Sequence, residues 1–270
     1  MTQTFKDFEH DGWQSAVEQY DNSFGNLTRQ AIPFILDVLT VKQGTRFLDV
    51  ACGPGYLAAA AKQRGAPVKA VDFSAAMLAK ARLANPGIDY AEGDAEDLQA
   101  FADNSFDAVG MNFGILHLGR PEAALTAMRR VLARGGRAAF TAWATEQEAV
   151  GFALVLRAIE RFGNPHIPLP AAPPFFRYSE PATCMDALSR CGFVHPNAQV
   201  IPQTWELDSP DEVFEAFLHG TARTGGLLRR QTPEQLLGIR EAVRASATAY
   251  VSQGKVHIPM PAVLAWAQKE

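Results

Sequence analysis

Three aspartates stand at positions that could bring their carboxylates together. Asp49, Asp72 and Asp94 each stand at or near the end of a short run of the kind that forms a buried strand. If these runs are neighbouring strands of one parallel sheet, the three acids lie at one edge of that sheet. There they could accept hydrogen bonds from amino, ammonium or hydroxyl groups of a ligand. Asp94 alone could equally cap a helix, but three acids on one edge favour a ligand site.

A glycine turn follows the first of these aspartates. Gly53-Pro54-Gly55 lies between a strand expected over 45–50 and a helix expected over 56–64. Glycine adopts backbone angles that other residues avoid, and it lets a ligand approach the main chain closely. The first amides of a helix have no partner within the helix, so they can bind a polar group there. The alternative is a tight turn without a ligand.

Two classes of ligand use a glycine turn after the first strand of such a sheet. One class is the dinucleotides, because Gly53, Gly55 and Ala58 match the pattern G-x-G-x-x-G/A and Asp72 could bind a ribose. The other is S-adenosylmethionine, which carries an ammonium, a carboxylate, a ribose and an adenine. A dehydrogenase needs neither Asp49 before the turn nor Asp94 after the third strand. The acids therefore favour the second class.

The segment 49–55 resembles the first motif of the class I S-adenosylmethionine-dependent methyltransferases, in which an acidic residue leads into a glycine turn. Ala51 stands where many members have another glycine. The resemblance extends over about residues 40–145 and is closest to the small-molecule branch that includes the ubiquinone and menaquinone enzymes. The other matching segments are Phe73–Met77, Gly93–Leu98, Ser105–Val109, Arg130–Leu132 and Gly135–Gly136.

The resemblance implies S-adenosyl-L-methionine as the cofactor and S-adenosyl-L-homocysteine as its product. Asp49 would pair with the ammonium, Asp72 with the ribose hydroxyls and Asp94 with the adenine amino group. Apolar side chains would cover the adenine ring, and the Tyr-Asp segment at 20–24 would fold over the cofactor. The cofactor-binding residues expected are Tyr20, Asp49, Ala51, Gly53, Gly55, Asp72, Phe73, Met77, Asp94, Ala95 and Asn112.

The reaction is expected beside the loop that follows the fourth strand, over 111–118. Methyl transfer is a direct displacement, so an enzyme mainly aligns the reactants and excludes water. His117 lies in this loop and could remove a proton from a hydroxyl or an acidic carbon. The alternative is a histidine that caps or packs at a helix start. The aromatic candidates for substrate contact are Phe113, Phe175, Phe176 and Tyr178.

A sheet must position these residues. Strand-like and helix-like segments alternate from 45 to 143, which predicts an α/β fold. We expect a doubly wound, mostly parallel seven-stranded sheet, Rossmann-like, with a helical cap. The expected strands of the core are 45–50, 67–73, 88–94, 105–113 and 135–143, and the expected helices are 56–64, 74–84 and 121–133.

The chain is expected to contain three regions. Residues 1–40 would form an N-terminal helical cap segment, and residues 41–145 would form the cofactor-binding core. Residues 146–270 would complete the sheet and add a lid loop over 164–181 and a helical insertion over 208–253 to the substrate cap. The proline-rich loop could also be a plain surface connection. Other expected elements are capping boxes at 145–148, 209–212 and 232–235, a helix over about 180–191, and strands over about 198–206 and 261–267.

Composition limits the partners. The net charge is −4 and the arginines are scattered, so we expect no nucleic-acid partner. No Asn-Pro-Pro-aromatic motif follows the fourth strand, which also makes macromolecular acceptors less expected. No apolar run reaches the roughly 18 residues that span a bilayer. The polar N-terminus is unlike a signal peptide, and the three cysteines suit the cytoplasm.

The histidines show no spacing typical of metal ligands, so no metal site is expected. Cys184 and Cys191 are expected as small buried residues, with an arsenite-binding role beside Cys52 as a remote alternative. The expected function is methyl transfer from S-adenosylmethionine to an oxygen or carbon of a small apolar or aromatic molecule. The alternatives are an NAD(P)-dependent oxidoreductase and a non-catalytic protein that binds S-adenosylmethionine. The sequence leaves the oligomeric state open.

Overall fold

The structure is a computed structural model that describes residues 3–270, except for the side chain of Asn22. The chain divides into two compact units, each considered by itself. Unit 1 comprises the described part of Met1–Leu27 together with Thr145–Ala172 and Pro202–Pro261. Unit 2 comprises Thr28–Ala144, Pro173–Ile201 and Ala262–Glu270.

Unit 2 is built on a seven-stranded sheet with the order β3-β2-β1-β4-β5-β10-β6. The strands from β3 to β5 pair in parallel, whereas β10 is antiparallel to both β5 and β6. The prediction of a doubly wound, mostly parallel sheet is therefore confirmed. The strands are β1 Phe47–Val50, β2 Val68–Asp72, β3 Asp89–Glu92, β4 Phe106–Met111, β5 Leu132–Trp143, β6 Val194–Ile201 and β10 Ala262–Gln268.

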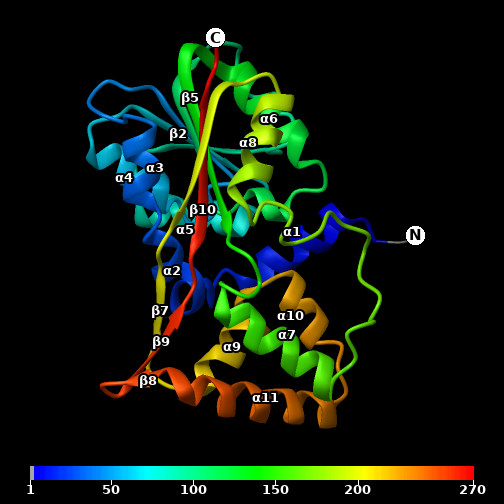
Figure 1. Cartoon of the computed structure of the whole chain (residues 1–270). Coiled ribbons are helices and arrows are strands. Elements are labelled where there is room, and N and C mark those ends of the chain that lie inside the picture. Colours follow the sequence, from blue (N-terminus) through cyan, green and yellow to red (C-terminus); the bar gives the residue numbers. More distant parts are fainter. Residues whose placement is uncertain (1–2) are drawn as a thin grey trace. The chain divides into compact units, whose positions relative to one another are not determined.

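Helices cover both faces of this sheet. Figure 1 shows α3 and α4 on one face and α6 and α8 on the other. All four residues of β1 are buried, as expected of a strand covered on both sides. The helices are α3 Ile32–Val38, α4 Tyr56–Gln63, α5 Ala75–Ala84, α6 Pro121–Val131 and α8 Pro181–Arg190, with a 3-10 turn, η2, at Ile115–His117.

Unit 1 packs around an aromatic core. Trp205 is 1% exposed, stacks on Phe24 with ring centroids 4.8 Å apart, and donates its indole N–H to the Ser23 carbonyl at 2.9 Å. Its three-stranded sheet has the order β7-β9-β8. The elements are α1 Phe5–Ala16, η1 Asp21–Gly25, α7 Val150–Phe162, α9 Asp211–Gly220, α10 Arg223–Leu228, α11 Pro233–Ala247, η3 Thr248–Tyr250, β7 Thr204–Leu207, β8 Val251–Ser252 and β9 Lys255–Pro259. The short helix α2, Asn26–Arg29, spans the boundary of the two units.

The expected strand over 198–206 is wrong, because two strands of different sheets occupy it. β6 ends at Ile201 and β7 begins at Thr204. Pro202, which has no N–H to donate to a ladder, lies between them. The β7-β9-β8 sheet was not predicted, since its strands are short and β7 pairs with residues about fifty positions away along the chain.

The capping boxes differ in their outcome. Thr232 and Gln235 form the predicted box at the start of α11. The Thr145 hydroxyl contacts the Glu148 carboxylate at 2.6 Å, but α7 begins only at Val150. At the start of α9, the amide that donates to the Glu212 carboxylate belongs to Asp208 and not to the expected Ser209.

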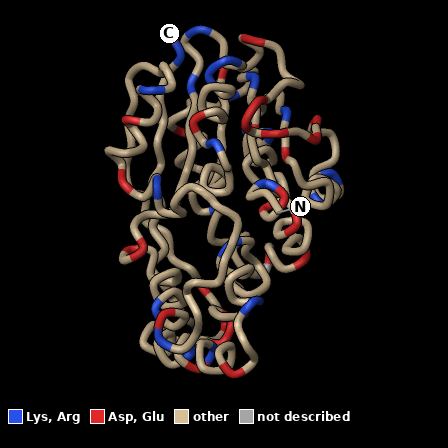
Figure 2. The backbone as a smooth tube through the Cα atoms, turned by 90° about the vertical axis from the view of Figure 1, so that its right-hand side faces the viewer, with Lys and Arg blue, Asp and Glu red and all other residues tan. Residues whose placement is uncertain are grey.

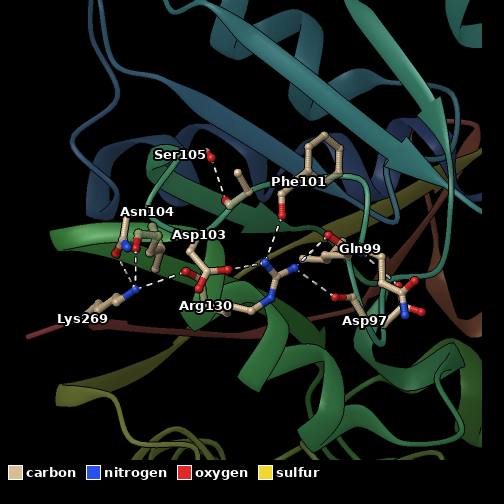
Figure 3. Close-up of polar contacts among 11 residues, drawn as sticks. Asp97, Gln99, Phe101, Asp103, Asn104, Ser105, Arg130 and Lys269 are labelled. Carbon is tan, nitrogen blue, oxygen red and sulfur yellow. Dashed lines mark hydrogen bonds and ion pairs between the residues drawn. The ribbon is translucent and has the colours of Figure 1, made fainter.

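Arg130, near the end of α6, donates hydrogen bonds to the backbone of the loop that connects β3 and β4. Its guanidinium donates to the carbonyls of Asp97, Leu98 and Phe101 and pairs with the Asp103 carboxylate at 2.6 Å (Figure 3). On the same side, the Lys269 ammonium beyond β10 donates to the carbonyls at 130 and 132. These bonds fix the backbone that continues from the predicted adenine segment.

Substitution Arg130→Met should lower the free energy of unfolding by about 2–3 kcal/mol, because three carbonyls lose a charged donor. Urea denaturation measures this loss. The control is Arg134→Met, an exposed arginine close by in the chain, for which a change within about 0.5 kcal/mol is expected. Equal effects of the two substitutions would contradict the structural role of Arg130.

Candidate active site

The carboxyl ends of β1 and β2 bring two buried aspartates together. Asp49 is 1% exposed and Asp72 is 6% exposed. One Asp72 carboxylate oxygen accepts from the Gly53 amide at 2.7 Å, and the other accepts from the Ser74 amide at 2.9 Å. Asp72 therefore joins the glycine turn after β1 to the turn after β2.

The turn adopts the backbone that its residues predict. Gly53 has a φ of +52° and Gly55 a φ of +80°, in the left-handed region that glycine tolerates. Ala51 also has a positive φ, of +52°. The Asp49 carboxylate accepts from the Ala58 amide at 2.8 Å and so caps the first turn of α4. Asp49 thus has a capping role as well as a place beside the turn.

Burial raises the pKa of both acids. Loss of water raises the pKa of Asp49 well above its usual value, and the nearby Asp72 charge raises it further, while the Ala58 amide lowers it. Burial also raises the pKa of Asp72, against the amides of Ser74 and Gly53 and the charge of His117. A cationic group of a ligand would stabilise the ionised carboxylates at this place.

Gly55 approaches a tyrosine of β3. A Cβ atom built on Gly55 would lie 2.7 Å from the Tyr90 hydroxyl oxygen. That oxygen is buried and has no hydrogen-bond partner within the described residues. The close approach adds a steric reason for glycine to the positive φ.

Substitution Gly55→Ala should weaken binding of S-adenosylhomocysteine about 10- to 30-fold, because the added methyl group must displace Tyr90 or the turn. Calorimetry measures the affinity. The matched control is Gly44→Ala, which has a similar φ of +83° but nothing within 4 Å of the added atom. Adding Tyr90→Phe to Gly55→Ala should restore part of the affinity. An unchanged affinity in Gly55→Ala would refute the steric argument.

The expected adenine contacts lie at the ends of neighbouring elements. The Asp94 carboxylate, two positions beyond β3, accepts from the Glu96 amide at 2.8 Å. Ala95 and Met77 are buried, and Phe73 is half-buried between β2 and α5. The structure therefore places these residues after β2 and β3, at the same edge of the sheet as the glycine turn.

A hydrogen-bonded group follows β4. The Thr141 hydroxyl donates to the Asn112 side-chain oxygen at 2.8 Å and accepts from the Phe113 amide at 2.9 Å. Phe113 has a φ of +56°, and its ring lies 4.1 Å from the ring of Trp143. Sequence reasoning missed Thr141, which is fully buried. The signal available was a polar residue within the apolar run at the end of β5.

The loop after β4 also contacts the turn after β1. A Cβ atom built on Gly114 would lie 2.7 Å from the Cβ atom of Ala51. The two loops are therefore packed with no room for an additional methyl group. This contact fixes the start of η2, which carries His117, against the first motif.

His117 lies at the end of η2 beside an aromatic pair. Its ring centroid is 6.3 Å from that of Phe175, which is 5.1 Å from Phe176. The His117 ring lies close enough to Asp72 for a positive charge on the ring to lower the pKa of that carboxyl, so both residues belong to one neighbourhood. Tyr178, by contrast, is 3% exposed and donates its hydroxyl to Glu122 of α6 at 3.1 Å, which ties it to the packing of that helix.

Tyr20 belongs to unit 1, where its ring contacts Trp13 edge-on at 5.7 Å. Within unit 2 the structure brings together the acids, the turn, the loop after β4, His117 and Phe175. The roles of these residues toward a ligand stay predictions.

Comparison with known proteins identifies one domain of the chain. Residues 48–140 match the family model described as "Methyltransferase domain". The chain carries a class I S-adenosylmethionine-dependent methyltransferase domain. S-adenosylmethionine is the methyl donor of this class, so the resemblance seen in the first motif is confirmed.

Two relatives illustrate the range of the match. A demethylmenaquinone methyltransferase of Renibacterium salmoninarum is 41% identical over 110 residues, which cover 41% of this chain and 46% of the relative. A malonyl-[acyl-carrier protein] O-methyltransferase of Erwinia billingiae is 29% identical over 230 residues, covering 82% of this chain and 84% of the relative. The chain spans about half the length of the first curated relatives that it matches.

Solved structures agree on the fold of the methyltransferase domain. A phosphoethanolamine N-methyltransferase 2 of Haemonchus contortus, in complex with S-adenosylhomocysteine, has a TM-score of 0.59 at 20% identity. The match covers 100% of this chain and 61% of that one.

Two further observations concern the described residues, 3–270. None of their His, Cys, Asp and Glu side chains gather in groups of three or more that could hold a metal ion. Among the helices in this range, none has both the length and the apolar character that crossing a membrane requires. Figure 2 shows Lys and Arg interspersed with Asp and Glu along the backbone.

Proposed function

We propose that the chain transfers a methyl group from S-adenosylmethionine to an oxygen or carbon of a small apolar or aromatic molecule. The observation that carries the proposal is the pair of buried carboxylates beside the glycine turn, Asp49 bonded to the Ala58 amide and Asp72 to the Gly53 amide. A cationic ammonium would stabilise the first carboxylate, whose pKa burial raises. The second faces the turn where ribose hydroxyls would lie.

The residues present fit this cofactor. When bound, S-adenosylmethionine supplies an electrophilic methyl group on a sulfonium. Asp49 would hold the ammonium, Asp72 the ribose, and Asp94 with Met77 the adenine. A Cβ atom built on Gly53 would have no atom within 4 Å, so a ligand could approach the backbone of the turn there.

The chemistry on the acceptor side would depend on the loop after β4. His117 would remove the proton of an acceptor hydroxyl or acidic carbon as the new bond forms. Phe175 and Phe176 would present an apolar wall beside that proton and exclude water. The name of the Erwinia relative specifies an oxygen acceptor, which is one of the two acceptor atoms proposed.

A ligand titration tests the cofactor. S-adenosylhomocysteine should raise the melting temperature of the protein, because a ligand that binds only the native state stabilises it. NADH should leave the melting temperature unchanged, and so should S-adenosylhomocysteine with the Asp72→Ala variant. Tighter binding of NADH would instead support an oxidoreductase, since Gly53, Gly55 and Ala58 also match the dinucleotide-binding pattern G-x-G-x-x-G/A.

A turnover screen tests the reaction. With S-adenosylmethionine and a library of phenols and quinols, at least one acceptor should yield S-adenosylhomocysteine faster than the protein-free mixture. A protein that binds the cofactor and methylates no member of the library would support the non-catalytic alternative.

A further inference from the structure

The aromatic pair beside His117 lies on a turn that follows a stretch without regular structure. Residues 167–174 form neither helix nor strand, and Phe175 and Phe176 come directly after them. The Ser179 amide donates to the Phe176 carbonyl at 3.2 Å, which closes the turn 175–178. The place of the aromatic wall therefore depends on what holds this turn to the rest of unit 2.

One carboxylate oxygen of Glu122 joins the turn to α6. It accepts from the Arg177 guanidinium and from the Tyr178 hydroxyl, the latter at 3.1 Å. Glu122 is the second residue of α6, where the helix dipole favours a negative charge, and it follows His117 by five positions. The same acid is thus close in the chain to His117 and bonded to the two residues that follow the phenylalanines.

The two partners of this acid differ in their surroundings. Tyr178 is 3% exposed, its ring lies edge-on to that of Phe140 at 5.7 Å, and its carbonyl accepts from the Cys184 thiol at 3.2 Å. Burial and the Glu122 charge raise the pKa of Tyr178, so its hydroxyl stays protonated and can donate. The Arg177–Glu122 pair is 35% and 34% exposed, and a pair of that exposure adds little net stability. We therefore expect the pair to matter more for the position of the turn than for the stability of the protein.

Two contacts join the same two segments of the chain. At one contact the rings of Phe175 and His117 lie 6.3 Å apart, and at the other Glu122 holds Arg177 and Tyr178. Arg177 is only two positions beyond Phe175. A shift of the turn at Glu122 must therefore move the Phe175 ring relative to His117.

We propose that Glu122 is a positioning residue of the acceptor site, which acts through Arg177 and Tyr178 to hold Phe175 against His117. This inference rests on the proposed function, in which the aromatic wall excludes water while His117 removes a proton from the acceptor. Tyr178, which the sequence suggested for substrate contact, would instead anchor the wall. A displacement of about 1 Å at a reacting pair costs up to about 100-fold in rate, so a loosened wall should be measurable in the kinetics.

The first test is a double-mutant cycle on kcat/KM for an acceptor found in the screen. Glu122→Ala should lower kcat/KM about 10- to 100-fold, and so should Phe175→Ala. In the Phe175→Ala background, Glu122→Ala should change kcat/KM less than threefold further, because the ring through which Glu122 acts is already gone. Glu122→Gln, which keeps an oxygen that can accept from Tyr178, should lose less than Glu122→Ala. The affinity for S-adenosylhomocysteine should stay within threefold in every variant.

The matched control is Asp107→Ala. Asp107 pairs with Arg46 at 2.6 Å, and both side chains are partly exposed, as in the Arg177–Glu122 pair. Asp107 lies near the start of β4, whereas His117 follows the end of that strand. The control removes a comparable ion pair, and it should leave kcat/KM within threefold of wild type.

The second test uses the NMR signal of the His117 imidazole, which requires neither turnover nor cofactor. The ring current of Phe175 shifts the resonances of nearby protons, so Phe175→Ala should move the signal that disappears in His117→Ala. Glu122→Ala should move the same signal in the same direction, and Asp107→Ala should leave it in place.

Each contrary result has a definite meaning. The inference is overturned by an unchanged kcat/KM in Glu122→Ala, by losses that multiply in the double variant, or by an unmoved His117 signal. A parallel loss of affinity for S-adenosylhomocysteine would also overturn it, in favour of a general disturbance of the fold. In all four cases wild type still turns over, and the proposed function stands. If wild type methylates no acceptor, the proposed function fails, and the His117 signal alone decides whether Glu122 positions Phe175.

Discussion

Substitution His117→Ala is expected to lower turnover about 100-fold while the affinity for S-adenosylhomocysteine stays within about threefold. The magnitude is that of general-base catalysis by a positioned side chain. Affinity should hold because the polar groups of the cofactor are proposed to bind other residues. His117 is positioned for this role by η2, whose start is packed against Ala51, and by the ring of Phe175 at 6.3 Å.

Steady-state kinetics with an acceptor from the screen measures this effect. The defect should shrink for acceptors whose hydroxyl is more acidic, such as nitrophenols, because less help is then needed to remove the proton. The control is His219→Ala, an exposed histidine of α9, which should retain its turnover. A His117→Ala enzyme with most of its turnover, or a defect independent of acceptor acidity, would make His117 a structural residue.

Substitution Asp49→Asn is expected to weaken S-adenosylhomocysteine about 100-fold or more, because an ammonium bound in a buried place loses its counter-charge. The same change should raise the melting temperature of the ligand-free protein. An asparagine oxygen can still accept from the Ala58 amide, while the cost of burying a carboxylate disappears. Calorimetry and thermal denaturation should therefore respond in opposite directions, which distinguishes a ligand-binding residue from a purely structural one.

The raised pKa of Asp49 also sets how this stability difference depends on pH. Its pKa in the folded state lies above the ordinary value of 3.8, so between the two values the folded protein holds a proton that the unfolded chain has released. Stability then falls as pH rises through that window. The ligand-free Asp49→Asn variant should exceed wild type in stability most at high pH, and the difference should vanish on acidification to about pH 3.8. An advantage that grows on acidification would contradict the buried carboxylate.

The affinity of wild type for S-adenosylhomocysteine should fall on acidification, whereas its stability relative to Asp49→Asn should improve. Acidification protonates Asp49 and should weaken S-adenosylhomocysteine in wild type more than in Asp49→Asn. Burial raises the pKa of Asp72 in the same direction, so only the difference between the two proteins isolates Asp49.

The glycine turn and the acids beside it were predictable because the constraints on them are local. The positive φ at Gly53 and Gly55 and the acids after β1 and β2 lie within short segments whose residue types allow few alternatives. Thr141 carries no such signal, because its partner, Asn112, lies far away in the chain. No periodicity in a sequence reports a contact of that kind.

The C-terminal part was harder to predict for a related reason. A run of strand-forming residues over 198–206 does not show that Pro202 divides two sheets. The partners of β7 and β6 are β9 and β10, which come only after the helices α9 to α11. Strand pairing over such separations depends on the tertiary fold, whereas the helix start at Thr232 depends on neighbouring residues and was predicted correctly.

The register around β10 has an evolutionary consequence. Ala262 pairs with Ile201 on one side and with Trp143 on the other. The segment 202–261 therefore starts at the end of β6 and returns to the sheet at the paired position of its neighbour, β10. The entropic free-energy cost of closing a loop rises only with the logarithm of the loop length, by about 0.6 kcal/mol for each doubling. Chain closure alone would therefore let a lineage change the length of this segment at small cost to the sheet and its row of aspartates, and the packing of Trp205 in unit 1 sets the larger constraint.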